Sequence, residues 1–328
     1  MSDMQNHSDA VPSKTARVKV PDRFYDPARQ QGHLERMIYQ SREYAGDGGQ
    51  VEKAAMVYLP YGYELGDGEK ISGSGVKRAE NRRYNILYLM HGSGGTEIEY
   101  MGSEREPNRL KNMIDHMIEE GLIDPMIIVM PTFPTENLEE CRNRALSFPK
   151  ELLNDLIPAV ETRFRTFADE VTREGLRKSR GSRAFGGFSL GSVTTWAVFA
   201  DAMDEVEYYL PMSGDCWKFE HFGGREHPGL AASFLSRAVA ASGYKREDYF
   251  IFAATGTEDS AYEILPPQLA EMKKYPETFV CTEKDFSGGN MFYYLAEGNK
   301  HGYRYTYEYI FNALPLFFRD KTEETRKL

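Results

Sequence analysis

From residue 84 onward, hydrophobic positions follow two alternating periods. Short apolar or aromatic runs, typical of buried strands, alternate with segments whose apolar residues recur every three or four positions, as on one face of a helix. The strand-like runs are YNILYLM (84–90), MIIVM (126–130), SRAFGGFS (182–189), VEYYLPM (206–212), DYFIFAATG (248–256) and NMFYYLAEG (290–298). The helix-like segments are residues 108–121, 148–164, 190–202, 230–242, 260–275 and 305–318. This order predicts an α/β fold, a mostly parallel sheet with crossover helices on both faces.

The part of the chain before residue 84 predicts strands and polar connections. The strand candidates are HLERMIYQ (33–40) and EKAAMVYLP (52–60), and the polar stretch 64–83 predicts a surface loop. Residues 1–22 are polar and are expected to be disordered or to lie along the surface, and residues 323–328 form a polar tail. Since no linker or repeat divides the remainder, residues 23–322 are predicted to form a single domain.

The composition and net charge of the chain limit the kinds of molecule that it is expected to bind. The chain has 328 residues, 41 % of them hydrophobic, and a formal net charge of -10. A nucleic-acid or anionic-membrane partner would require a basic face, so neither is expected, and a neutral substrate fits better. The sequence does not indicate an oligomeric state.

The cysteines and the N-terminal residues indicate whether a metal site is expected and in which cellular compartment the protein is expected. Cys141, Cys216 and Cys281 form no metal-binding spacing, and no metal or organic cofactor is expected. The N-terminus lacks the apolar core of a signal peptide, and no apolar run is long enough to span a membrane. The chain as written is expected to be cytoplasmic, or secreted if a leader has been removed from it.

A G-x-S-x-G pattern at residues 187–191 marks the candidate nucleophile, Ser189. A nucleophile elbow is a sharp turn between a buried strand and a helix, with small residues on both sides of the serine. The pattern here follows an apolar segment and opens a helix-like one, so the context favours a catalytic serine over an ordinary glycine-rich turn.

The stretch HGSGGT (91–96), at the end of an earlier predicted strand, supplies a candidate oxyanion loop. Acyl transfer requires backbone N–H groups directed at the developing oxyanion, one of them from the residue after the nucleophile. Leu190 would provide that amide, and Ser93 or Gly94 the other. A phosphate-binding loop is disfavoured, because the stretch has neither the lysine of G-x-x-x-x-G-K-[ST] nor a G-x-G-x-x-G followed by a ribose-binding acid.

The serine needs a base, and the base needs a carboxylate that orients it. His301 follows the last predicted strand, where the base of such enzymes lies. Asp215 and Asp259 each end a predicted strand, and spacing alone does not choose between them; Glu258 is a third option. His91 is expected to support the glycine-rich loop.

These motifs together resemble the feruloyl esterases of carbohydrate esterase family 1, relatives of esterase D with the α/β-hydrolase fold. The resemblance extends from about residue 30 to 320. It rests on VYLPYGY (57–63), LYLMHGSGG (87–95), FPKELLNDLIPAVETRF (148–164), GGFSLGSVTTW (186–196), LPMSGDCW (210–217), FAATGTED (252–259) and the His301 loop.

The resemblance implies roles that spacing left open. It assigns the triad acid to Asp259, places Asp215 near the active site or its acyl pocket, and implies hydroxycinnamoyl esters of arabinoxylan as substrates. Some relatives have tryptophan after the catalytic histidine, whereas this chain continues with Gly302 and Tyr303. An aromatic acyl group requires an apolar slot, for which the candidates are Trp217, Phe219, Phe222 and Tyr303. The loop 215–229 is a candidate cover.

Two other functions remain open at this point. One keeps the triad but hydrolyses a short-chain acyl ester, acetyl-xylan or a thioester such as S-formylglutathione. The other is a non-catalytic carbohydrate-binding relative of the hydrolases, against which the complete set of triad candidates argues.

Overall fold

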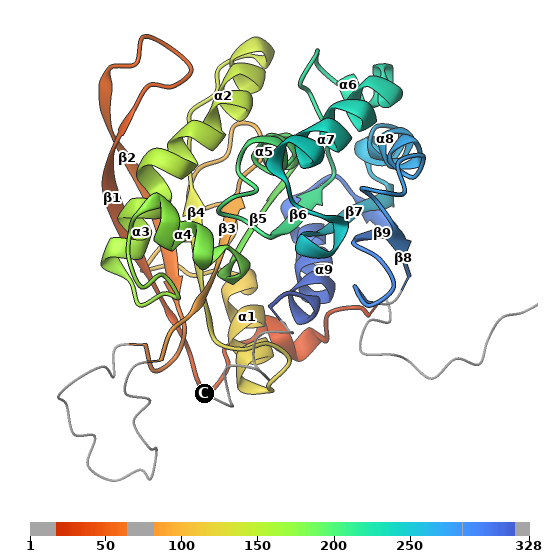
Figure 1. Ribbon diagram of the computed structural model, residues 1–328. Helices are drawn as coiled ribbons and strands as arrows, with labels where there is room; N and C mark the ends of the chain where they lie inside the picture. The colour runs from red at the N-terminus through yellow and green to blue at the C-terminus, as the bar shows by residue number, and fades with distance from the viewer. Residues whose placement is uncertain (1–17, 64–81, 284, 319–328) are drawn as a thin grey trace, which may run out of the picture.

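A single sheet forms the centre of the fold (Figure 1). The computed structural model describes residues 18–63, 82–283 and 285–318, and within these ranges the sheet has nine strands. In spatial order they are β1 (His33–Arg42), β2 (Gln50–Leu59), β4 (Met126–Pro131), β3 (Asn85–Met90), β5 (Arg183–Phe188), β6 (Tyr208–Met212), β7 (Phe250–Glu258), β9 (Met291–Lys300) and β8 (Cys281–Thr282). The β1–β2 and β2–β4 pairs are antiparallel, and all other pairs are parallel.

Helices cover both faces of the sheet (Figure 1). One face packs against α1 (Arg109–Glu119) and α9 (Tyr303–Ala313). The other packs against α2 (Leu138–Glu151), α3 (Ile157–Arg163), α5 (Leu190–Asp201), α7 (Pro228–Ser242) and α8 (Leu265–Met272). Within β3, Ile86 and Tyr88 point to the second layer and Leu87 and Leu89 to the first, which follows from the two-residue period of a strand. Because both faces of these parallel strands are buried, their sequences are continuous apolar runs and do not alternate between apolar and polar residues.

The predicted helix at 148–164 is longer and less regular than its pattern suggests. α2 begins at Leu138, contains Pro149, and continues through a π-helical turn (Leu152–Leu156) into α3. A proline inside a helix removes one N–H donor and crowds the preceding turn, and π-helical turns occur mostly as single turns within α-helices, as here. The short helices α4 (Arg173–Lys178) and α6 (Gly223–Glu226) and the two-residue strand β8 have too few periodic positions to be predicted.

The N-terminal residues of the described part lie along α9. Val18 N–H donates to Asn312 Oδ1 at 3.0 Å, and Lys19 Nζ lies 2.8 Å from Glu308 Oε2. The rest of the predicted N-terminal segment (1–17), most of the predicted loop (64–81) and the tail fall outside the described residues.

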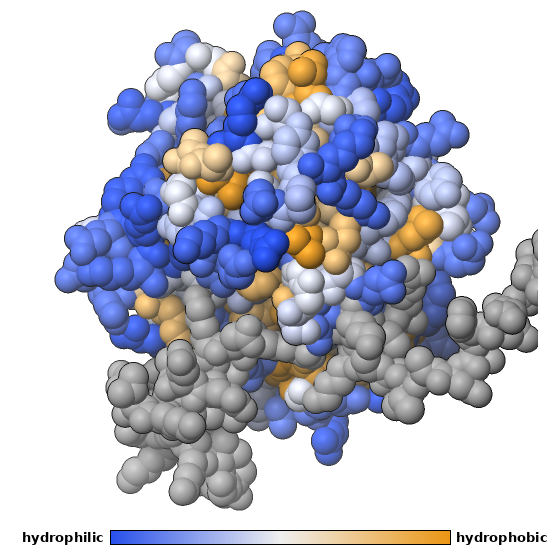
Figure 2. Space-filling model, turned by 45° about the vertical axis from the view of Figure 1, so that its right-hand side comes forward, coloured by the Kyte–Doolittle hydropathy of each residue, from blue (hydrophilic) through white to orange (hydrophobic). Residues whose placement is uncertain are grey.

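The surface seen in Figure 2 is mainly hydrophilic, with small and separate apolar areas. Within the described ranges, no helix combines the length and the apolar character needed to cross a membrane.

Candidate active site

Ser189 occupies a strained turn between β5 and α5. Its backbone has φ 56° and ψ -113°, a conformation that costs free energy for a residue with a Cβ, and its N–H donates to Met212 O at 2.8 Å. The flanking glycines make the turn possible. A Cβ on Gly191 would lie 2.1 Å from Met90 O, and one on Gly187 would lie 2.6 Å from the Gly191 backbone. The G-x-S-x-G pattern is therefore required by close backbone contacts as well as by the turn.

A continuous chain of hydrogen bonds joins Ser189 to two side chains from later strands. His301, directly after β9, places Nε2 3.0 Å from Ser189 Oγ and Nδ1 2.7 Å from Asp259 Oδ1. Asp259 lies directly after β7, so three parallel strands bring the three side chains to the same edge of the sheet. The structure thus brings together the predicted nucleophile, base and acid.

Asp259 is held in the ionised form. Burial raises the pKa of its carboxyl, but hydrogen bonds from His301, the Ala261 N–H and Ser213 outweigh burial, and the pKa lies below its usual value. The side chain has no exposed surface, whereas that of His301 is 35 % exposed. The histidine can therefore meet a substrate while its partner stays shielded.

Ser213 is a member of this site that the sequence did not reveal. Its hydroxyl donates to Asp259 Oδ2 at 2.7 Å, and its backbone has φ 59°, in the left-handed region. The residue lies directly after β6, between the strands that carry Ser189 and Asp259. The segment LPMSGDCW places this serine at the end of a predicted strand, which could have suggested a position near the site. Its contact with Asp259, however, depends on the register of β6 and β7, which the sequence does not show.

The glycine-rich loop after β3 lies against the serine. A Cβ on Gly92 would be 3.4 Å from Ser189 Cβ, and the Gly92 N–H donates to the Tyr303 hydroxyl at 2.7 Å. In the described ranges, the amides of Ser93 and Leu190 have no hydrogen-bond acceptor. Both are therefore available to an incoming oxyanion. His91 is buried and bonds Gly92 O at 2.7 Å and Thr132 Oγ1 at 2.9 Å, a supporting position for the loop.

Asp215 lies in the loop after β6 and has no exposed surface. Burial raises the pKa of its carboxyl to about 6. Its oxygens accept from Trp217 Nε1 at 2.7 Å and from the Arg225 N–H at 3.0 Å, so they face this loop and not His301. This buried carboxylate is positioned to orient the Trp217 indole and is not exposed to a substrate. Burial also raises the pKa of the neighbouring Cys216 thiol to about 12, as expected for a packing residue.

Several bonds hold the predicted cover loop to the neighbouring helices. Arg142 Nε donates to Trp217 O at 2.9 Å, and His221 Nε2 bonds Leu138 O at 2.9 Å, both joining the loop to α2. Phe222 packs on Trp217 with ring centres 5.1 Å apart. Phe219 instead packs on Phe234 of α7, with ring centres 5.8 Å apart, and so lies apart from the Trp217–Phe222 pair.

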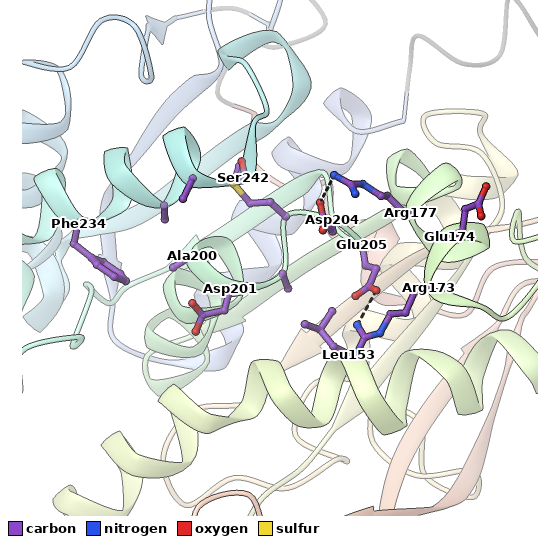
Figure 3. A pocket seen from close by; sticks show the side chains of 14 residues that line it. Leu153, Arg173, Glu174, Arg177, Ala200, Asp201, Asp204, Glu205, Phe234 and Ser242 are labelled. Atoms are coloured by element: carbon purple, nitrogen blue, oxygen red, sulfur yellow. Dashed lines mark hydrogen bonds and ion pairs between the residues drawn. The ribbon is translucent and has the colours of Figure 1, made fainter.

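A hollow of about 750 Å³ lies elsewhere, at the C-terminal end of α5 (Figure 3). Its ion pairs join Arg173 to Glu205 and Arg177 to Asp204, each at 3.0 Å. Ser189 precedes the opposite end of α5, a helix of 12 residues and therefore about 18 Å long. This hollow is thus separate from the candidate active site.

Sequence comparison relates the chain to xylan-degrading enzymes. It is 37 % identical over 301 residues to endo-1,4-beta-xylanase Y of Acetivibrio thermocellus, covering 92 % of this chain and 24 % of that protein. It is 27 % identical over 230 residues to an endo-1,4-beta-xylanase/feruloyl esterase of Xylanibacter ruminicola, covering 65 % of this chain and 27 % of that protein. The chain thus spans about a quarter of the length of these curated relatives. No protein-family profile matches it.

Comparison of structures decides the family. A feruloyl esterase module from Clostridium thermocellum, solved as a serine-to-alanine mutant complexed with sinapinate, is 34 % identical, with a TM-score of 0.77 and 97 % of both chains covered. The chain belongs to the feruloyl esterases of carbohydrate esterase family 1. The family resemblance and the α/β-hydrolase fold predicted from the sequence are therefore confirmed.

More distant relatives share the fold of this feruloyl esterase family member. The ferulic acid esterase of Anaeromyces mucronatus is 16 % identical with a TM-score of 0.61, covering 91 % of this chain and 96 % of that one. The S-formylglutathione hydrolase of Staphylococcus aureus is also 16 % identical, with a TM-score of 0.55, covering 88 % and 98 %.

Proposed function

We propose that this protein is a serine carboxylesterase that hydrolyses hydroxycinnamoyl esters, such as feruloyl and p-coumaroyl esters of arabinoxylan or its oligosaccharides. The hydrogen-bonded chain from Ser189 through His301 to Asp259, at 3.0 and 2.7 Å, carries the proposal. Membership of the feruloyl esterase family supports the choice of acyl group. Residues 23–322 are proposed to be the catalytic domain.

In the proposed reaction, His301 Nε2 takes the Ser189 proton as Oγ attacks the ester carbonyl. The oxyanion is stabilised by the Leu190 and Ser93 amides. His301 then gives its proton to the leaving sugar oxygen, and a water activated by the same histidine hydrolyses the acyl-enzyme. Ionised Asp259 keeps the imidazole oriented and stabilises its protonated form. No step in this sequence requires a metal or an organic cofactor.

The acyl group is proposed to lie between the loop after β6 and the glycine-rich loop. Trp217 supplies an aromatic wall whose orientation depends on the hydrogen bond to Asp215. Tyr303 packs on Phe188 at 5.2 Å between ring centres and accepts from the Gly92 N–H, so its proposed role combines the pocket wall with support of the oxyanion loop.

Relative rates on methyl ferulate and p-nitrophenyl acetate test the acyl preference. Methoxide is a poorer leaving group than p-nitrophenolate, so leaving-group reactivity alone predicts a much lower kcat/KM for methyl ferulate than for p-nitrophenyl acetate. We expect the measured kcat/KM for methyl ferulate to exceed that prediction. If the two kcat/KM values, corrected for leaving-group reactivity, are equal, the result would instead favour a short-chain esterase. Ser189→Ala is the blank, and full activity of this variant would overturn the mechanism.

The compartment stays a prediction from the sequence. Detection of the native protein in cell and culture-medium fractions distinguishes the cytoplasmic from the secreted alternative.

A further inference from the structure

A second hollow, of about 530 Å³, lies beside the start of α9. It is bounded by the N-terminal segment from Lys19 to Tyr25, by Arg109 at the start of α1, and by the first two turns of α9. Figure 1 shows the N-terminal segment, in red, running beside α1 and α9. The volume falls within the usual range of a small-molecule site. We call this hollow the α9 groove.

Tyrosine rings form much of the lining of the α9 groove. Tyr25 and Tyr307 lie with ring centres 6.3 Å apart, and Tyr305 projects from the first turn of α9. All three rings are partly exposed. Tyrosine offers an apolar face to the C–H groups of a sugar ring and a hydroxyl to its oxygens.

Two guanidinium groups in the α9 groove retain donors for a ligand. Arg109 lies 5.8 Å from the Tyr25 ring centre, and Arg304 lies 4.5 Å from that of Tyr305. Both side chains are exposed, and neither forms an ion pair with a carboxylate in the described ranges, although Arg304 already uses one donor on the Tyr305 hydroxyl. The third cation, Lys19, is already paired with Glu308. Arginine carries five N–H donors in a planar array, which suits the neighbouring hydroxyls of a sugar.

The α9 groove lies along the helix that begins two residues after the candidate catalytic histidine. His301 precedes α9 by two residues, and the side chain of Tyr303 turns toward Gly92 and the serine. Arg304 and Tyr305 follow directly on the same helical turn and face the groove. Tyr303 also packs on Tyr100, with ring centres 5.3 Å apart. The first turn of α9 therefore carries a side chain directed at the candidate active site, Tyr303, next to two that line the groove, Arg304 and Tyr305.

We propose that the α9 groove is a subsite for the oligosaccharide part of the ester, holding pentose units beyond the sugar that carries the acyl group. The inference rests on the proposed function, since it names the place of the leaving alcohol. Stacking on the tyrosines and hydrogen bonds from Arg109 and Arg304 would hold the sugar chain.

Kinetics with esters of different alcohols test this subsite. The double variant Arg304→Ala/Tyr305→Ala is compared with the wild type on a feruloylated arabinoxylo-oligosaccharide and on methyl ferulate. We expect the ratio of kcat/KM for the oligosaccharide to kcat/KM for methyl ferulate to be about tenfold lower in the double variant than in the wild type. A tenfold change corresponds to the loss of one charge-assisted hydrogen bond. Arg246→Ala, which removes an exposed arginine just before β7, is the matched control and should leave this ratio unchanged.

Calorimetric titration with unesterified xylotetraose separates the subsite from the reaction. We expect the wild type to bind the sugar and the double variant to bind it about tenfold more weakly. Equal binding by both proteins, or none by the wild type, would overturn the subsite even if feruloyl esters are hydrolysed. Sugar binding in the α9 groove without hydrolysis of methyl ferulate would instead support the subsite and contradict the proposed function.

Discussion

Replacement of Asp259 by asparagine tests the role proposed for this carboxylate. Oδ1 accepts from both the Ala261 N–H and His301 Nδ1 at 2.7 Å, and Oδ2 accepts from the Ser213 hydroxyl at 2.7 Å. The side-chain oxygen of an asparagine must take the place of Oδ1, because an NH2 group there would face the Ala261 N–H, and two donors cannot form a hydrogen bond. Its NH2 would then face Ser213 Oγ, which can also accept. His301 therefore keeps its proton on Nδ1, and the variant loses mainly a negative charge.

The size of the effect follows from the charge separation. Two unit charges about 4 Å apart at an effective dielectric constant of about 20 attract by about 4 kcal/mol. Because the His301 side chain is 35 % exposed, screening reduces this attraction, and we expect a loss of about 2–4 kcal/mol of transition-state stabilisation. This corresponds to a fall in kcat of about 30- to 1,000-fold, with KM changed much less.

The assay is steady-state hydrolysis of methyl ferulate near neutral pH, with circular dichroism to verify folding. Asp215→Asn is the matched control, because Asp215 faces Trp217 and Arg225 and should affect mainly KM. A larger fall in kcat for Asp215→Asn than for Asp259→Asn would show that the wrong carboxylate has been assigned. An Asp259→Asn variant with half of the wild-type kcat would refute the electrostatic reasoning.

Three further predictions concern support of the site. Tyr303→Phe removes the acceptor of the Gly92 N–H, and kcat for methyl ferulate should fall about tenfold; an unchanged kcat would mean that this bond does not position the loop. Gly191→Ala places a Cβ 2.1 Å from Met90 O and should lower the free energy of unfolding by about 1–3 kcal/mol in urea titrations, whereas wild-type stability would contradict the close packing of the elbow. The Asp215 carboxyl has a pKa raised to about 6 when folded, so its protonation stabilises the native state and this contribution disappears as pH rises from about 4 through 6. The stability lost on Asp215→Asn should therefore shrink by about 2 kcal/mol between pH 4 and 7, and a loss independent of pH would count against the raised pKa.

Local patterns were sufficient to predict the elements that carry the nucleophile. The apolar run of β5, the glycines around Ser189 and the helical period of α5 are all properties of adjacent residues. The first part of α2 was missed because its buried face consists largely of the small residues Cys141 and Ala145 among charged neighbours. Such a face gives little periodic hydrophobic signal.

Contacts between strands explain what the sequence alone could not decide. Asp215 and Asp259 both follow parallel strands that end at the same edge, so spacing left the two equivalent. In the structure, Asp259 Oδ1 lies 2.7 Å from His301 Nδ1. Asp215 instead accepts a hydrogen bond from the indole N–H of Trp217. The hydrogen bond of Ser213 to Asp259 likewise depends on tertiary packing and leaves no pattern along the chain.

Release of ferulate from a feruloylated arabinoxylo-oligosaccharide, followed by liquid chromatography for the wild type and Ser189→Ala in parallel, tests the central claim most directly. We predict rapid release by the wild type and a rate lower by a factor of about 10⁴ or more for the variant. Comparable release by both proteins, or a wild type that cleaves acetylated xylan but no feruloyl ester, would contradict the account.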